Sequence, residues 1–302
     1  MNYGIQLLII FALVALGTLK TTLQGGISKN YIRNTQDTLI YNTEVFAAIA
    51  VVMLLLFKVS VPDKTLMIFA FVVACTTLVF QSTYSVALSI GPVSLTVLII
   101  NFNVLLTTAV SVFVFGDKFY LTQFIGILFL VASMFLSMTK VDDGKKISAK
   151  WLILVIVAAI STGAGALLQK QYGKMPTEVE ASDTTFLFVL YGIASLLGVV
   201  TVIVKRYTGK KEKSTMGLNK KVICVSAVIG LVLGVYQKLN MYALVNIDGT
   251  LLFPTYAGLA SLAMTFIGVI MFKDRLSKKQ MWGVVCGIVC VALMNLRIGL
   301  YI

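Results

Sequence analysis

The chain has 302 residues, of which 59% are hydrophobic and only 12% are charged, whereas ordinary soluble domains carry roughly 25% charged residues. This composition and a mean hydropathy of +0.96 exclude a soluble globular protein. The net charge of +13 lies mostly in short connectors, which favours a membrane orientation signal over nucleic-acid binding.

Apolar segments of about 20 residues recur along the chain, and each is long enough to cross a hydrocarbon core as a helix. Period-two alternation is absent, so we predict helices and not a closed barrel. The longest polar interruptions are far too short for a soluble domain. The predicted spans cover residues 3–29, 36–57, 65–89, 92–115, 119–138, 150–171, 184–204, 221–246, 249–271 and 278–297.

The first span lacks a basic leader and a small-residue cleavage pattern, so we expect it to remain attached. Lys and Arg are concentrated in the connectors opposite the termini, and the positive-inside rule therefore places both termini outside.

The chain contains no histidine, and its four cysteines lie in or beside apolar spans. We therefore expect no metal site and no cofactor.

Two distant segments repeat one pattern: "GDKFYLTQFIGILFLVASMFL" and "KDRLSKKQMWGVVCGIVCVAL". The matched pairs, at one constant offset, are Asp117 with Asp274, Gln123 with Gln280, and Gly126 with Gly283. This predicts a duplication, with five helices in residues 1–145 and five in 146–302. Because each half holds an odd number of spans, the second half would enter the membrane inverted, as in many secondary transporters.

A wider pattern, "ALSIGPVSLTVLI…FVFGDKFYLTQFIGILFLVASMF" with its echo "ALVNIDGTLLF…IMFKDRLSKKQMWGVVCGIVCVALM", resembles the EamA-type branch of the drug/metabolite transporter superfamily. The resemblance covers nearly the full length. It implies an all-α membrane protein of ten transmembrane helices, in two inverted five-helix repeats around a central cavity. It also implies a non-enzymatic transporter of small metabolites, and we expect a multi-pass protein of a bacterial inner or plasma membrane.

Two lysines interrupt apolar spans. At about 1.5 Å per residue, Lys238 lies roughly 13 Å from the end of its span, and Lys20 lies at a similar depth measured from the opposite side. Placing a lysine in lipid costs about 2.5–3.5 kcal/mol. The lysine side chain is too short to carry its ammonium group from this depth to the membrane interface. We therefore predict that both lysines face a wet cavity. They could bind an anionic group of a solute.

Glu44 lies at nearly the same depth as Lys20. Two interpretations stay open. The two side chains could form a structural ion pair within the membrane, or Glu44 could carry protons or contact the solute.

Other polar side chains inside spans are candidates for solute contact. Asn103 is the strongest, because an amide is costly to bury unpaired. Tyr242 lies one turn from Lys238 and shares its face, although tyrosines are also common interfacial anchors. The remaining candidates are Gln81, Tyr84, Gln237, Asn240 and Tyr256.

The segments "GLVLG" (230–234) and "GVVCG" (283–287) have the GxxxG spacing of close helix contacts, which is compatible with packing inside the chain or with a homodimer. We expect the lipid bilayer and a small-molecule metabolite as partners, and no nucleic acid.

The sequence favours a secondary transporter that moves a small polar or charged metabolite by alternating access, and the lysines favour an anionic or zwitterionic one. The alternatives are an exporter of drugs or organic cations that uses Glu44, a membrane enzyme acting on lipid carriers, and a non-transporting helper protein. No nucleophile-base pair or phosphate loop supports the enzyme.

Overall fold

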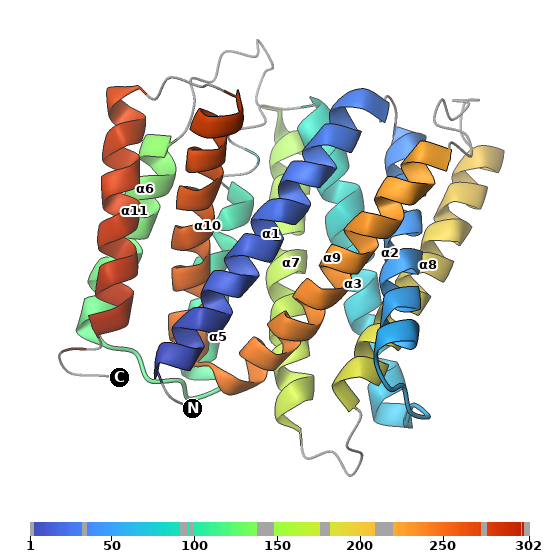
Figure 1. The fold of residues 1–302 in the computed structure, drawn as a ribbon, viewed down its shortest axis with the longest axis horizontal. Coiled ribbons are helices and arrows are strands. Elements are labelled where there is room, and N and C mark those ends of the chain that lie inside the picture. Colours follow the sequence, from blue (N-terminus) through green and yellow to red (C-terminus); the bar gives the residue numbers. More distant parts are fainter. Residues whose placement is uncertain are drawn as a thin grey trace.

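A computed structural model describes residues 3–31, 35–90, 96, 99–137, 148–175, 182–208, 220–272, 277–296 and 298. Within these ranges the chain is helical and has no strand. The helices are α1 (Tyr3–Tyr31), α2 (Thr35–Leu56), α3 (Lys64–Ile90), α5 (Asn103–Phe113), α6 (Leu121–Ser137), α7 (Ala149–Lys174), α8 (Ser182–Thr208), α9 (Lys220–Asn246), α10 (Gly249–Phe272) and α11 (Lys278–Leu296). They stand side by side in one bundle (Figure 1).

Each predicted span corresponds to one of these helices, with ends that agree within a few residues. The exception is the fourth span, 92–115, much of whose first half lies outside the described residues. By length and apolarity, 7 helices of the described chain could cross a membrane: α1, α2, α3, α7, α8, α9 and α11. The prediction of a multi-pass, all-helical membrane protein is confirmed, while ten crossings remain a prediction.

The main interfaces join helices from the first half of the chain to helices from the second. α2 packs on α8, α6 on α11, α3 on α7, and α9 on both α1 and α2. The start of α1 and the end of α11 lie at the same edge of the bundle (Figure 1), where the Tyr3 hydroxyl donates to the Asn295 carbonyl at 3.0 Å. The core therefore lies between the halves and not within either one.

Glycines allow the closest of these contacts. A Cβ on Gly230 would lie 2.3 Å from Cβ of Ala48 on α2. In the second GxxxG segment, the Ser133 hydroxyl of α6 donates to the Gly283 carbonyl of α11 at 2.7 Å. All four glycines of the two segments are buried within the chain. A homodimer would therefore have to use another surface.

The contact at Gly230 predicts a large difference between two glycine substitutions. In Gly230→Ala, the new methyl would also meet the Ala48 carbonyl carbon at 3.1 Å, so the backbones must separate. We expect a loss of about 1–3 kcal/mol. Gly192→Ala on α8 is the matched control, because nothing lies within 4 Å of its Cβ position. It should be neutral or slightly stabilising. Thermal unfolding in detergent measures both, and equal midpoints would contradict the packing described.

Candidate functional site

A cavity of about 1080 Å³ lies between the halves and is lined by residues from every described helix. Its walls are rich in carboxamides, hydroxyls and tyrosines. Among the described residues that line it, Lys20 is the only one with a charged side chain. The lining carboxamides are Asn42, Gln81, Asn101, Asn103, Gln169, Gln237, Asn240 and Gln280.

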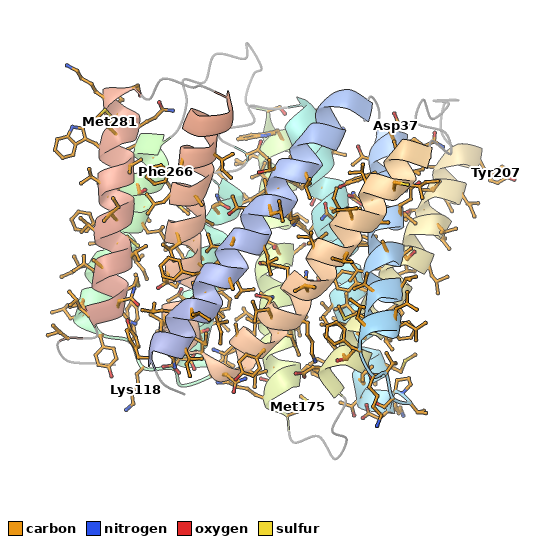
Figure 2. All side chains as sticks on the ribbon, in the orientation of Figure 1. Asp37, Lys118, Met175, Tyr207, Phe266 and Met281 are labelled. Atoms are coloured by element: carbon orange, nitrogen blue, oxygen red, sulfur yellow. The ribbon has the colours of Figure 1, made fainter. Side chains whose placement is uncertain are left out.

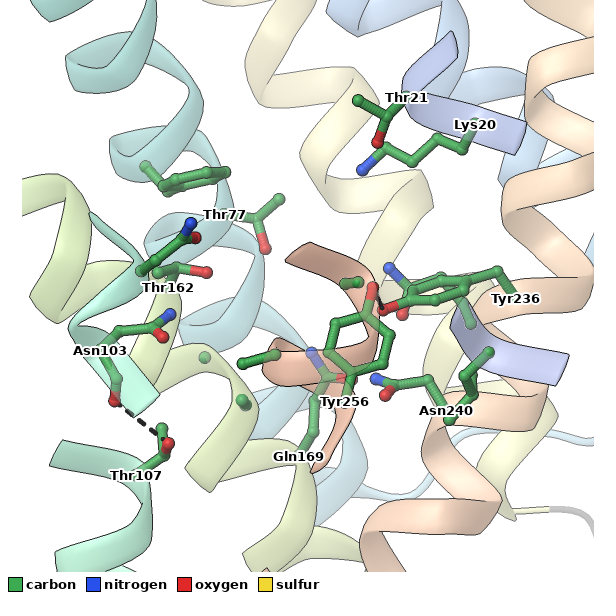
Figure 3. A pocket seen from close by; sticks show the side chains of 18 of the residues that line it. Lys20, Thr21, Thr77, Asn103, Thr107, Thr162, Gln169, Tyr236, Asn240 and Tyr256 are labelled. Carbon is green, nitrogen blue, oxygen red and sulfur yellow. Dashed lines mark hydrogen bonds between the residues drawn. The ribbon is translucent and has the colours of Figure 1, made fainter. Parts of the chain in front are cut away.

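Lys20 projects from α1 into this cavity (Figure 3). One turn earlier, α1 approaches α10 so closely that a Cβ on Gly17 would lie 2.7 Å from the Tyr256 hydroxyl. This contact fixes the part of α1 that carries the lysine. No ion pair or hydrogen bond joins the Lys20 amine to any other described residue. Within the described part of the chain, no side chain therefore competes with a solute for this amine.

Two tyrosines and two glutamines also line the cavity. The Tyr236 hydroxyl donates to the Tyr256 hydroxyl at 3.2 Å, and Figure 3 shows this pair between Lys20 and Asn240. The side-chain oxygens of Gln169 and Gln237 are buried and have no hydrogen-bond partner among the described residues. Because buried polar atoms are normally paired, these oxygens are acceptors available to a ligand or to water.

The opposite wall belongs to α3, α5 and α7. Asn103 and Thr162 face Lys20 across the cavity (Figure 3). The Thr107 hydroxyl donates a hydrogen bond to the Asn103 carbonyl at 3.1 Å, as threonines often do inside helices. Next to this wall, the rings of Phe80 and Tyr84 stack with centroids 5.5 Å apart. The cavity thus has a cationic wall and a neutral, hydrogen-bonding wall.

The structure brings most of the predicted site residues together, without testing whether they bind a solute. Those that line the cavity are Lys20, Gln81, Tyr84, Asn103, Gln237, Asn240 and Tyr256. Those that do not are Lys238, Glu44 and Tyr242.

Lys238 does not face the cavity, contrary to our expectation. It shares a face of α9 with Tyr242, as predicted, but that face points outward, since Leu231, Val235 and Tyr242 are 49%, 36% and 45% exposed. The cavity side of α9 is the stripe that carries Gln237, one residue and about 100° away. The depth of Lys238 along its span, which the sequence indicates, does not say toward which side of the helix its side chain points.

Glu44 does not pair with Lys20 in the described part of the chain. Its Oε2 accepts a hydrogen bond from the Ser226 hydroxyl of α9 at 3.2 Å. The carboxylate thus lies in the contact between α2 and α9, outside the cavity lining.

A second polar cluster was not anticipated from the sequence. Lys170 of α7, fully buried, forms an ion pair with Asp117 in the loop between α5 and α6. The same carboxylate accepts from the Gly249 backbone N–H at 2.6 Å and lies 3.5 Å from the Lys174 amine. The Lys170 amine also lies 4.9 Å from the centre of the Phe115 ring. We call these five residues the Asp117 cluster.

Local sequence explains how Asp117 reaches this position. Gly116 has a φ of +66°, the left-handed conformation that ends α5 and turns the chain. The carboxylate then meets the first N–H of α10, where the helix dipole favours an anion. A Cβ on Gly249 would lie 2.1 Å from the Ser111 hydroxyl and 2.9 Å from the Lys170 amine, so only glycine fits there.

The Asp117 cluster lies next to the cavity. Gln169 lines the cavity, and the next residue, Lys170, belongs to the cluster. Figure 2 places Lys118 and Met175 at the edge of the bundle where α1 begins. The cluster therefore ties the first half, through Asp117, to α7 and α10 of the second half on the side of the termini. Asp274, the repeat partner of Asp117, lies outside the described residues.

In the ranges given above, no group of three or more Cys, Asp and Glu side chains is placed to hold a metal ion. The described lining residues offer binding through one ammonium and many neutral donors and acceptors.

Comparison with known proteins agrees with the fold. One crystal structure of a protein superposes with a TM-score of 0.74 over 97% of this chain and 96% of that chain, at 14% identity, which shows a shared fold. No curated protein matches. The model of the EamA-like transporter family matches residues 6–139 and 149–296. These two ranges cover nearly the whole chain, and it belongs to the EamA-like transporter family, within the drug/metabolite transporter superfamily.

Proposed function

We propose that this protein is a secondary transporter that moves a small anionic or zwitterionic metabolite through the cavity by alternating access. The proposal includes ten spanning helices in two inverted five-helix repeats, in a bacterial inner or plasma membrane. Interfaces that join one half to the other support it, because a site between two repeats can be exposed to either side when the halves rock.

The observation that carries the anionic character is Lys20. A lysine within a membrane span is costly and normally faces water or a partner. Lys20 is the only charged side chain on the cavity wall among the described residues, and none of them neutralises it. An anionic group on the solute would complete this site.

The cavity residues have distinct roles in this mechanism. Lys20 attracts and holds the anionic group, while carboxamides of the opposite wall replace the water that the solute loses. The Asp117 cluster holds the halves together on the side of the termini, so the cavity is closed there while it loads from the other side. Opening toward the termini requires these contacts to separate.

The rival proposal of a cation exporter depends on Glu44. That carboxylate lies against Ser226, outside the cavity lining, so an organic cation in the cavity would meet Lys20 and no carboxylate of the described chain. The geometry therefore favours an anion over a cation. No observation favours the helper or enzyme alternatives.

Counterflow in proteoliposomes tests the proposal. Labelled anionic, zwitterionic and cationic solutes are offered to the wild-type protein and to Glu44→Gln. We expect saturable exchange of an anionic or zwitterionic solute, largely preserved in Glu44→Gln. Exchange of cations alone, abolished by Glu44→Gln, would overturn the proposal, and so would the absence of any exchange across the panels.

A further inference from the structure

The residues of the cavity wall indicate the number of charges on the solute as well as their sign. Lys20 supplies one positive charge and the described lining supplies no carboxylate. Among the described lining residues, only Lys20 can therefore balance an ionic group of the solute. Uncompensated charge in a membrane cavity is costly, which disfavours a dianion such as a phosphate monoester as well as a cation.

A zwitterion is also a poor match for this wall. Its ammonium group would need a carboxylate or several oxygens directed at it. The acceptors among the described lining residues are neutral amide and hydroxyl oxygens on several helices. They suit neutral donors such as hydroxyl groups.

Two of these acceptors lack donors. The side-chain oxygens of Gln169 on α7 and Gln237 on α9 are buried in the cavity wall without a hydrogen-bond partner in the described chain. A purely apolar solute body would displace water and leave both unpaired, at a cost of about 1–3 kcal/mol each. A solute body that carries O–H groups would satisfy them.

The ammonium group of Lys20 and the carboxamides of the opposite wall are also separated in space. Figure 3 shows Lys20 and Asn103 on opposite walls, with Gln169, Tyr256 and Asn240 beside the space between them. A ligand can therefore place an acidic end on one wall and a neutral, hydrogen-bonding body against the other. The cavity volume of about 1080 Å³ leaves room for such a body together with water.

We propose, on the basis of the transport function above, that the substrate is a hydroxylated monocarboxylate whose carboxylate binds Lys20 and whose hydroxyl groups bind the carboxamides of the cavity. Lys20 sets the single negative charge. Gln169, Gln237 and Asn103 select for hydroxyl groups along the rest of the molecule.

Ligand-dependent thermal stabilisation of the detergent-purified full chain tests this, since binding to the native state raises the midpoint. The probes are gluconate, hexanoate as a carboxylate without hydroxyl groups, sorbitol as a polyol without charge, and glucose 6-phosphate as a dianion. We expect gluconate to bind wild type roughly tenfold or more tightly than each of the other probes. A factor of ten in affinity corresponds to the free energy of about one charged or two neutral hydrogen bonds.

Variants of the cavity residues test which side chains cause the preference for gluconate. Lys20→Gln should remove the advantage of gluconate over sorbitol, and Gln237→Met should reduce its advantage over hexanoate severalfold. Asn103→Leu, on the opposite wall, serves the same purpose if Gln237→Met does not fold. Lys238→Gln is the matched control, because that lysine lies on the outward face of α9, and it should bind all probes as wild type does.

Equal binding of hexanoate and gluconate, tighter binding of glucose 6-phosphate, or no binding of any probe would overturn the substrate class. These outcomes leave the transport proposal separately testable. Counterflow of an anion of another class that still depends on Lys20 would retain transport and reject only the hydroxylated monocarboxylate.

Discussion

Lys170→Met is expected to destabilise the protein by about 3–5 kcal/mol, because it leaves the Asp117 carboxylate buried without its cation. The side chain of Asp117 is only 4% exposed, and water cannot replace the lost partner. The remaining contacts of that carboxylate are the Gly249 N–H and the more distant Lys174 amine. Thermal or denaturant unfolding in detergent measures the loss.

Two further variants separate the buried charge from simple loss of packing. Lys174→Met is the matched control, since its amine is 3.5 Å from Asp117 and its side chain is 35% exposed, so the effect should stay below about 1 kcal/mol. Adding Asp117→Asn to Lys170→Met should restore part of the stability, because no unpaired charge remains buried. Equal, small effects of both lysine variants would show that the ion pair is not important for stability.

Lys20→Gln is expected to reduce kcat/KM for the anionic solute roughly tenfold to a hundredfold. A hydrogen bond to a charged group contributes about 1.5–3 kcal/mol, and each 1.4 kcal/mol is a factor of ten. Lys20→Arg keeps the charge and should retain part of the activity. Initial rates of proteoliposome uptake, corrected for the amount of reconstituted protein, give these ratios.

Lys238→Gln is the internal control for this experiment. Both lysines interrupt apolar helices at similar depth, but only Lys20 lines the cavity. The Lys238 variant should transport within about twofold of wild type, because it removes no group from the cavity wall. Comparable losses in the two variants, or no loss in Lys20→Gln, would contradict the assignment of the cationic site.

The sequence was sufficient to predict the helices, because apolar length is a local property and lipid leaves few alternatives to a helix. Most of the site residues predicted from the sequence line the cavity, since a polar side chain deep in an apolar span needs a wet or paired environment. Gln81 and Asn103 are examples, and both line the cavity.

The sequence could not give the rotation of α9 about its axis. In a soluble protein, the polar face of a helix marks the outside. Here Leu231 and Val235 face outward while Leu233 and Leu244 face the cavity, so both sides are apolar and the pattern does not distinguish them. This is why depth alone placed Lys238 in the cavity.

The Asp117 cluster was missed for a different reason. Lys170 lies one residue before the predicted end of the span 150–171, where a lysine is common as an interfacial residue. Its partner comes from a loop in the other half of the chain. The repeat gives no hint of the pair, because "LQKQ" (168–171) aligns with "LQGG" (23–26), so Lys170 corresponds to a glycine.

The most direct test of the central claim, that this cavity opens alternately to the two sides of the membrane, is cysteine accessibility at Asn240. In a variant without Cys75, Cys224, Cys286 and Cys290, Asn240→Cys is treated with a membrane-impermeant thiol reagent in right-side-out and in inverted vesicles. We expect modification from both sides, while Tyr242→Cys, on the outward face of α9, should react from neither. Modification of Asn240→Cys from one side only, or from neither, would contradict alternating access through this cavity.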